Sequence, residues 1–440
     1  EIGSGLVGSE MCIRDRYIEN LRFEKEQLDY LRSTKDFDED FLAYLENFRF
    51  SGDIYALEEG TVVFPGEPLM IVKAPIIEAQ LMESALLNIV NFQTLIATKA
   101  SRVAYVAQPG QVSEFGLRRA QAPDAAVYGA RAALIGGCSS TSNVLAAQMC
   151  DTFATGTHAH SWIMAFDSEL EAFRAYAEIY PDSCLLLVDT YDTLRGVKNA
   201  ITVFKEMREK GLKPKGIRLD SGDLAYLSKK AREMLDEAGF EDAMIFASGD
   251  LDEYTIQSLK LQGARIDCYG VGTKLITSHS NPSLGGVYKI CEVEENGVMT
   301  PKMKISDNPA KVTNPGEKRI FRLVSKNNNK AIADVICLAD EKIDESKPYT
   351  LIHPEYRWKT KEVRNFRAKE LYRQIYKDGK LVYDLPDLKT IQRRKRESFD
   401  EFWDEYKRLE KPHIYKVDLS EKLYNLKQKL IDELVGKKGK

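Results

Sequence analysis

The amino-acid sequence predicts an α/β fold whose core is a buried parallel sheet, accompanied by a β-rich region. Between residues 184 and 276, short apolar runs alternate with amphipathic helical patterns, which is typical of parallel strands covered on both faces. Each run ends in a polar residue or a glycine, and Gly- and Pro-rich turns separate Val- and Ile-rich runs on both sides of this stretch. The pattern fits a barrel or an open doubly wound sheet, and both bind ligands at the carboxyl ends of their strands.

The first part of the chain divides into three segments. Residues 1–16 resemble a translated sequencing adapter, so we expect a non-native leader in place of a native N-terminal segment. Residues 17–50 show helical spacing of apolar side chains, and residues 50–75 show short strands separated by turns. A core helix is predicted from 76 to 107. We therefore expect an N-terminal helical and β-rich region over 17–114.

The middle part, residues 115–281, is predicted to be the catalytic α/β domain. Four strand-and-helix units are visible, with strands expected at 185–188, 216–219, 244–247 and 266–269. The helix after the second strand ends at Gly239, a typical C-terminal cap.

The last part, residues 282–440, is predicted to return to hairpins and then to charged helices. Strands are expected over 286–293, 319–324 and 332–338, with turns at 294–297 and 326–330. This second β-rich region is expected to pack with the first. The basic run 392–396 is interpreted as a solvated helix face rather than a nucleic-acid site.

Composition excludes several classes of protein. The chain has 440 residues, and 63 basic against 67 acidic side chains give a net charge of −4, so neither disorder nor nucleic-acid binding fits. The seven cysteines are scattered without a Cys-x-x-Cys pair, which indicates buried thiols in a reducing compartment. Polar residues interrupt the apolar stretch 76–107, so no membrane span is expected. These observations predict a cytoplasmic location.

The strand ends carry groups suited to an anionic substrate. Gly-rich turns before a helix expose backbone N–H groups that bind phosphate oxygens. The alternative is that Asp and Gly at these places only cap helices and form turns. The candidate residues are Asp189 and Asp192, Arg218 with Asp220, Ser221 and Asp223, then Ser248, Gly249 and Asp250, and finally Gly270, Gly272 and Thr273.

Two further segments could carry chemistry. In Gly156-Thr-His158-Ala-His160, a structural role is expected for His158, whereas His160 could donate to phosphate or accept a phosphoryl group. No cysteine lies nearby in sequence, so a zinc site is not favoured. Arg118 and Arg119 could clamp a diphosphate or bond a neighbouring helix.

Together these motifs resemble the nicotinate phosphoribosyltransferase family, from residue 17 to the C-terminus. The segments that carry the resemblance are Phe115-Gly-Leu-Arg-Arg-Ala-Gln, Gly156-Thr-His-Ala-His-Ser, Leu187-Val-Asp-Thr-Tyr-Asp192, Gly216-Ile-Arg-Leu-Asp-Ser-Gly-Asp223, Ala247-Ser-Gly-Asp250 and Gly270-Val-Gly-Thr-Lys274, continuing through Asn281-Pro-Ser-Leu-Gly-Gly-Val-Tyr-Lys289.

The resemblance implies an irregular α/β barrel of the type II phosphoribosyltransferase kind, with a flanking β-rich domain. It implies that nicotinate reacts with 5-phosphoribosyl 1-diphosphate, assisted by ATP hydrolysis and Mg²⁺, in the first step of NAD salvage from nicotinate. Arg218 and Thr157 would bind the nicotinate carboxylate. Asp189 and Asp220 would orient ribose hydroxyls or Mg²⁺-bound waters. Gly249, Asp250, Gly272 and Thr273 would hold the ribose 5-phosphate, and Ser248 is a further substrate-binding residue.

The resemblance also implies a phosphohistidine at His160 and a homodimer. Ser142 is loosely aligned with an acidic residue of the nicotinamide-using enzymes, and a neutral side chain there favours nicotinate. The family's usual N-terminal tyrosine motif has no counterpart here, so low activity is expected. The alternatives are a nicotinamide or quinolinate phosphoribosyltransferase, or an N-terminally truncated inactive homologue.

Overall fold

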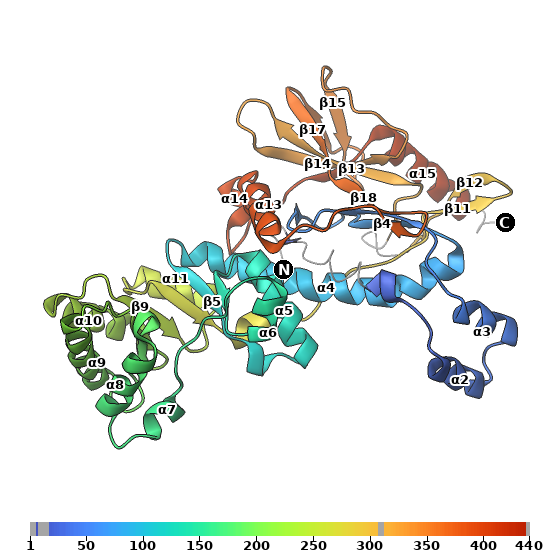
Figure 1. Ribbon diagram of the computed structural model, residues 1–440. Coiled ribbons are helices and arrows are strands. Elements are labelled where there is room, and N and C mark those ends of the chain that lie inside the picture. The colour runs from blue at the N-terminus through green and yellow to red at the C-terminus, as the bar shows by residue number, and fades with distance from the viewer. Residues whose placement is uncertain (1–5, 8–16, 307–311, 437–440) are drawn as a thin grey trace. The chain divides into compact units, whose positions relative to one another are not determined.

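The structure is a computed structural model that describes residues 6–7, 17–306 and 312–436 (Figure 1). The chain forms two compact units. Unit 1 combines residues 1–92 with 284–440, and unit 2 comprises residues 93–283. The leader expected at 1–16 lies outside the described residues, apart from strand β1 (Leu6–Val7), which pairs with β3 (Val62–Val63) in antiparallel fashion.

Unit 2 is built on one sheet of six parallel strands. The hydrogen-bonded order is β6-β5-β10-β9-β8-β7, and each neighbouring pair in this order is parallel. The bounds are β5 (Gln111–Glu114), β6 (Ser140–Thr141), β7 (Leu185–Leu187), β8 (Gly216–Leu219), β9 (Met244–Ser248) and β10 (Cys268–Val271). Because the strands are parallel, their carboxyl ends lie along the same edge of the sheet. The residues that follow the strands therefore all lie at that edge.

Helices follow these strands as predicted. Figure 1 shows α8, α9 and α10 lying together beside the sheet. The helices and 3₁₀ turns associated with unit 2 are α4 (Ile76–Ala107), which runs in from unit 1, η1 (Leu117–Arg119), α5 (Pro123–Gly136), α6 (Val144–Met149), α7 (His160–Met164), α8 (Glu169–Ile179), η2 (Pro181–Ser183), α9 (Thr193–Glu209), α10 (Leu224–Glu237), α11 (Glu253–Leu261) and α12 (Thr273–Ile276).

Three of the helices after strands begin at an aspartate cap. The carboxylates of Asp192, Asp223 and Asp252 accept from backbone N–H groups in the first turns of α9, α10 and α11. Two of the polar residues that the sequence suggested as substrate contacts, Asp192 and Asp223, therefore have the capping role that was the alternative.

The predicted α/β core is confirmed as an irregular α/β barrel. Among the described residues no strand pairing joins β6 to β7, so the hydrogen-bonded order has two ends. Two boundaries differ from expectation. Unit 2 begins at residue 93 rather than 115, because β5 precedes 115 and is a strand of this sheet. The fourth strand begins at Cys268 rather than 266, so Gly270 lies inside β10.

Unit 1 is the separate β-rich domain. Its first sheet has the order β19-β18-β2-β4, and its second has the order β16-β15-β20-β14-β13-β17. The bounds are β2 (Asp53–Leu57), β4 (Met70–Lys73), β11 (Glu292–Glu295), β12 (Val298–Pro301), β13 (Lys318–Ser325), β14 (Ala331–Leu338), β15 (Tyr349–Ile352), β16 (Thr360–Val363), β17 (Phe366–Glu370), β18 (Tyr372–Lys377), β19 (Lys380–Leu381) and β20 (Val417–Leu419). The helices are α2 (Lys25–Thr34), α3 (Glu39–Glu46), α13 (Leu388–Asp400), α14 (Asp404–Lys407) and α15 (Glu421–Gly436).

The two β-rich regions share one sheet, as expected. Strand β2 pairs with β18 in antiparallel register, with Tyr372 opposite Leu57. The hairpin β13–β14 also forms where it was predicted. The strand expected over 286–293 is found only from Glu292, and it turns at Asn296 and Gly297, both with positive φ, into β12.

A charged cluster lies inside the second sheet of unit 1. Arg322 and Asp334 are both fully buried, and their side chains are joined by hydrogen bonds of 2.7 to 3.2 Å. Arg322 also donates to the carbonyl oxygen of Val62, and Tyr415 donates to Asp334 at 2.7 Å. Burial raises the pKa of Glu67 well above its usual range, and the neighbouring Asp334 raises it further. This cluster joins the segment around Val62 to the hairpin β13–β14.

Across the stretches that the structure describes, no helix is long and apolar enough to cross a membrane.

Replacing Arg322 by Met should lower the free energy of unfolding of unit 1 by about 3–5 kcal/mol, because Asp334 would remain as a buried charge without its partner. Urea denaturation followed by circular dichroism measures this. The control is Arg319→Met on the same strand, whose side chain is 46% exposed and should change stability by less than about 1 kcal/mol. Equal losses in the two variants would contradict the prediction.

Candidate active site

The predicted site residues meet at the carboxyl edge of the parallel sheet of unit 2. Asp189 follows β7, Arg218 and Asp220 lie at the end of β8, Ser248 ends β9, and Thr273 follows β10. The segment 157–160 is joined to the same edge, because Thr157 and His160 contact the end of β8. One sheet edge therefore brings together groups that are separated by more than 100 residues in sequence.

Arg218 is the central cation of this edge. Its Nε donates to Ser248 Oγ at 2.8 Å, its Nη1 to Thr157 Oγ1 at 2.8 Å and its Nη2 to Asp220 Oδ1 at 2.7 Å. The guanidinium group also lies over the ring of Phe115, at 5.4 Å from the ring centroid. Because a guanidinium has five N–H donors, three bonds hold its plane and two donors are left for an anion.

Two carboxylates flank this arginine. Burial alone would raise the pKa of Asp220, but the hydrogen bond from Ser248 and the charge of Arg218 outweigh it and hold the pKa below its usual range. Asp189 Oδ2 accepts from the backbone N–H of Asp220 at 3.0 Å and from the hydroxyl of Ser221 at 2.6 Å. Its Oδ1 is buried and has no hydrogen-bond partner among the residues that the structure describes. Asp189 therefore uses one carboxylate oxygen to hold the turn after β8, and its other oxygen makes no hydrogen bond within the described part of the chain.

The two histidines of segment 157–160 have different surroundings. His158 is buried, its Nε2 accepts from the backbone N–H of Leu187 at 3.2 Å, and burial lowers its pKa to about 4. This confirms the structural role expected for His158. His160 begins α7 and its side chain is 41% exposed, with Nε2 at 3.7 Å from Asp220 Oδ2 and Nδ1 at 3.1 Å from Thr190 Oγ1. His160 is thus the accessible imidazole of the site.

A backbone cradle follows β9. Gly249 and Asp250 both have positive φ, +106° and +44°, so the backbone turns through the left-handed region directly after β9. A Cβ at Gly249 would come within 2.3 Å of the carbonyl oxygen of Asp220, so only glycine fits there. Gly272 lies close to the carbonyl of Phe115 and precedes Thr273. These turns lie at the carboxyl ends of β9 and β10, and their role as a phosphate site stays a prediction.

Gly270 does not belong to this cradle. It lies inside β10, where a Cβ would come within 2.7 Å of Phe246 and 2.9 Å of Phe115. The interpretation of Gly270 as a phosphate-binding turn residue is therefore wrong. Its lack of a side chain instead leaves room for the stacked rings of Phe115 and Phe246, whose centroids are 5.4 Å apart.

The two arginines of η1 are exposed. In the part of the chain that the structure describes, neither Arg118 nor Arg119 has a hydrogen bond or ion pair, so the alternative of bonding a neighbouring helix is not what is observed. Glu114 holds the loop that carries them. Its carboxylate accepts hydrogen bonds from Thr141 Oγ1, at 2.6 Å, and from the backbone N–H of Gly116. Burial raises the pKa of Glu114, against these two bonds.

Three contributors were missed by sequence reasoning. The ring of Phe115 packs against the guanidinium group of Arg218. Glu114 holds the loop of Arg118, and Thr190 contacts His160. Phe115 opens one of the quoted motifs, but no role was given to it, and Glu114 directly precedes that motif. Thr190, next to Asp189, could have been found only by asking which hydroxyl follows each strand.

The acidic groups fit Mg²⁺ held through waters and substrate phosphates. Among residues 6–7, 17–306 and 312–436 no cluster of three or more His, Cys, Asp or Glu could hold a metal ion by itself. Mg²⁺ usually takes one or two carboxylates and keeps several waters. The free oxygen of Asp189 and the charged Asp220 satisfy that requirement at adjacent strand ends.

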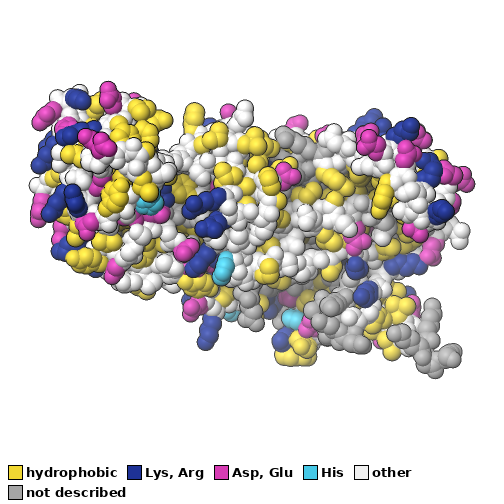
Figure 2. Space-filling view, turned by 90° about the horizontal axis from the view of Figure 1, so that it is seen from below, with side chains coloured by type: hydrophobic (Ala, Val, Ile, Leu, Met, Phe, Trp, Pro, Cys, Tyr) yellow, Lys and Arg dark blue, Asp and Glu magenta, His cyan; other side chains and the backbone are white. Residues whose placement is uncertain are grey.

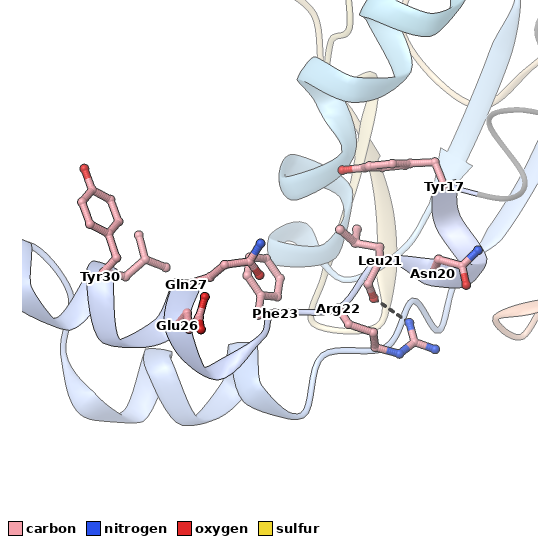
Figure 3. Close-up of a pocket in the computed structure, with 9 residues that line it drawn as sticks. Tyr17, Asn20, Leu21, Arg22, Phe23, Glu26, Gln27 and Tyr30 are labelled. Atoms are coloured by element: carbon pink, nitrogen blue, oxygen red, sulfur yellow. Dashed lines mark hydrogen bonds between the residues drawn. The ribbon is translucent and has the colours of Figure 1, made fainter. Parts of the chain in front are cut away.

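A groove of about 750 Å³ lies elsewhere, in unit 1 (Figure 3). Figure 3 shows its lining residues. Tyr17, Leu21 and Phe23 come from the segment before α2, and Tyr30 comes from α2 itself. None of its nine lining residues is a predicted site residue. The size of this groove therefore does not mark the chemical site.

His158 should make the protein less stable as the pH falls. Its folded pKa is below its unfolded value of 6.5, so the unfolded state binds the additional proton and stability is lost progressively from about pH 6.5 down to pH 4. The loss should reach about 2 kcal/mol at pH 5. Denaturant melts of the native chain and of His158→Gln at pH 8 and pH 5 measure it. The prediction fails if the Gln variant shows the same loss.

Comparisons with known proteins agree over the whole chain. Three family profiles match in succession: the nicotinate phosphoribosyltransferase N-terminal domain at residues 8–91, the nicotinate phosphoribosyltransferase family at 110–346 and the C-terminal domain at 317–427. Nicotinate phosphoribosyltransferase of Bacillus subtilis is 51% identical, covering 97% of this chain and 87% of its own length. The enzyme of the same name from Caenorhabditis elegans is 34% identical, covering 95% and 84%.

Solved structures give the same picture. The crystal structure of human nicotinic acid phosphoribosyltransferase matches with a TM-score of 0.86 and 28% identity, covering 97% of this chain and 93% of that chain. A nicotinate-nucleotide pyrophosphorylase from Pyrococcus furiosus, at 23% identity and a TM-score of 0.65, covers 90% and 88% and shares the fold. With its motifs on one sheet edge and its relatives matched along nearly their whole length, this chain belongs to the nicotinate phosphoribosyltransferase family.

Proposed function

We propose that the protein is a nicotinate phosphoribosyltransferase, which forms nicotinate mononucleotide and diphosphate from nicotinate and 5-phosphoribosyl 1-diphosphate. The pyridine nitrogen attacks the anomeric carbon, the N–C bond forms, and diphosphate leaves with the electron pair of the broken C–O bond. Positive charge develops on the sugar and negative charge on the leaving group, so positioning and electrostatics carry the reaction. The 51% identity to the Bacillus enzyme over most of both chains supports this assignment.

The observation that carries the substrate assignment is the bonding of Arg218. Its plane is fixed by Ser248, Thr157 and Asp220, and two N–H donors are left. Two donors on a planar fork match the two oxygens of one carboxylate. Phe115, below the guanidinium, supplies a flat apolar surface beside it. Arg218 with Thr157 therefore forms the pocket for the nicotinate carboxylate.

The choice of nicotinate over nicotinamide is supported by a neutral side chain. Ser142 follows β6, and its backbone N–H donates to the carbonyl oxygen of Glu114, next to the Phe115 loop. A neutral hydroxyl there does not repel an anionic carboxylate, whereas an aspartate would favour the carboxamide.

The remaining residues divide between the two ends of phosphoribosyl diphosphate. The turns of Ser248, Gly249 and Asp250, with Gly272 and Thr273, bind the ribose 5-phosphate through backbone N–H groups. The exposed Arg118 and Arg119 are free to meet the diphosphate. Mg²⁺ neutralises charge on the diphosphate when bound, and Asp189 and Asp220 hold its waters or the ribose hydroxyls.

ATP hydrolysis is coupled to the reaction through His160. A ring nitrogen attacks the terminal phosphorus of ATP, the N–P bond forms, and ADP leaves with the electrons of the broken P–O bond. Water later hydrolyses the phosphohistidine. Exposure of the ring and its place beside Asp220 support this role.

The protein is proposed to act as a homodimer in the cytoplasm. An apolar group on unit 2 supports self-association, because α6 and the segment after it expose Val144 (71%), Leu145 (54%), Met149 (47%) and Phe153 (89%). The six cysteines that the structure describes are free thiols, which fits a reducing compartment. On the face shown in Figure 2, both basic and acidic side chains are exposed.

Product formation tests the proposed function. The full chain is incubated with phosphoribosyl diphosphate, Mg²⁺ and either nicotinate or nicotinamide, each with and without ATP, and products are identified by mass spectrometry. We expect nicotinate mononucleotide, in larger amount with ATP. Product from the amide alone, or product from quinolinate with loss of CO₂, would replace the assignment. Binding of phosphoribosyl diphosphate without any product would support an inactive homologue.

Replacing Arg218 by Lys should reduce kcat/KM for nicotinate roughly 10- to 100-fold, because the ammonium keeps the charge but loses the planar fork. Steady-state kinetics with varied nicotinate measures this. The control is Arg174→Lys, an exposed arginine paired with Glu206 between α8 and α9, which should leave kcat/KM unchanged. Similar values for both variants would contradict the role of Arg218.

A further inference from the structure

The two nitrogens of the His160 ring have different neighbours. Nδ1 is 3.1 Å from Thr190 Oγ1, a hydrogen bond, whereas Nε2 is 3.7 Å from Asp220 Oδ2, too far for a direct one. Within the ranges that the structure describes, the hydroxyl of Thr190 is the group that hydrogen-bonds the ring. Thr190 lies directly after Asp189, in the segment between β7 and α9.

The ring has few other constraints. His160 is the first residue of α7, the preceding Ala159 provides no side-chain cap, and the ring is 41% exposed. The last torsion angle of a histidine side chain is broad and nearly two-fold, so packing alone does not distinguish a ring from its flipped form. A flip would place a carbon, rather than Nδ1, against the Thr190 hydroxyl and turn Nε2 away from Asp220. The hydroxyl therefore selects one of the two orientations.

We propose that Thr190 is a positioning residue for His160, whose hydroxyl holds Nδ1 and so keeps Nε2 turned toward Asp220. The part of this role that concerns phosphoryl transfer rests on the proposed function. The orientation itself rests only on the observed geometry. A hydroxyl suits the task because it can donate to a bare nitrogen or accept from an N–H group, and so holds the ring before and after transfer.

The segment that carries Thr190 is itself held in place. Its neighbour Asp189 accepts from the N–H of Asp220 and from the Ser221 hydroxyl, and Asp192 caps α9. Thr190 therefore lies between two fixed residues. The hydrogen bond between Thr190 and His160 links the end of β7 to the start of α7. Asp220, which follows β8, lies on the Nε2 side of the same ring.

The experiment compares Thr190→Val, which keeps the shape and removes the hydroxyl, with Thr190→Ser, which keeps the hydroxyl. Thr202→Val is the matched control, because its hydroxyl donates only to the carbonyl of Lys198 on the exposed face of α9. All variants are made in the full chain, and thermal melts verify that each is folded. If the Val variant does not fold, Thr190→Ala takes its place.

The first measurement does not depend on activity. The ligand-free protein is labelled with ¹⁵N-histidine, and the ring nitrogen resonances of His160 are assigned by their loss in His160→Gln. We expect the Nδ1 resonance to shift in Thr190→Val and to remain in place in Thr190→Ser and Thr202→Val. An unchanged spectrum in Thr190→Val would overturn the proposal.

The second measurement follows transfer of radiolabelled phosphate from the terminal position of ATP to the protein, with His160→Gln as the blank. Thr190→Val should slow it about 10-fold, whereas Thr190→Ser should restore at least half of the native rate. A native rate in Thr190→Val, despite a shifted resonance, would overturn the functional part. If the native chain takes up no phosphate, the ATP role of the proposed function fails, and the nitrogen resonances alone decide the orientation.

Discussion

Three side chains from three separate places in the chain end on one guanidinium group, and the geometry of the site depends on that convergence. Arg218 points from the end of β8 and is held by Ser248 at the end of β9, by Thr157 from the segment before α7 and by its own neighbour Asp220. These bonds leave the arginine little rotational freedom, so its free donors have a fixed direction before any ligand arrives. Such preorganisation reduces the cost of ordering on binding.

The same convergence orders the acidic groups. Asp220 shares Oδ1 with Ser248 and Arg218, which leaves Oδ2 facing His160. Asp189 uses one oxygen to hold the turn after β8 and keeps the other unbonded. Each carboxylate thus has one structural oxygen and one that is available. Asp192 and Asp223 have a different role, because their side chains cap the first turns of α9 and α10.

Sequence patterns were informative where local rules apply. The strands β7, β8 and β9 lie where apolar runs predicted them, because a strand buried on both faces needs an uninterrupted apolar run. The fourth strand was misplaced by two residues, because Gly270 resembles a turn residue in the local sequence, whereas in the sheet it pairs with Ser113 of β5 and Ser248 of β9. The pairing of β2 with β18 joins residues more than 300 apart, and no local pattern encodes such a partner. For the same reason Phe115, Glu114 and Thr190 acquired roles only in three dimensions, whereas Arg218 and Asp220 were accessible through their motif.

The sheet that β2 and β4 share with β18 and β19 has a consequence for biosynthesis. Unit 2 is one continuous stretch, residues 93–283, and all six of its strands have left the ribosome long before β18 is made. Strand β2, in contrast, waits with an unpaired edge until residues 372–377 emerge. At roughly 5–20 residues per second, translation of the intervening chain takes on the order of tens of seconds. During that time the exposed edge of β2 is open to pairing with other chains, so a chaperone that covers it should favour a high yield of folded protein.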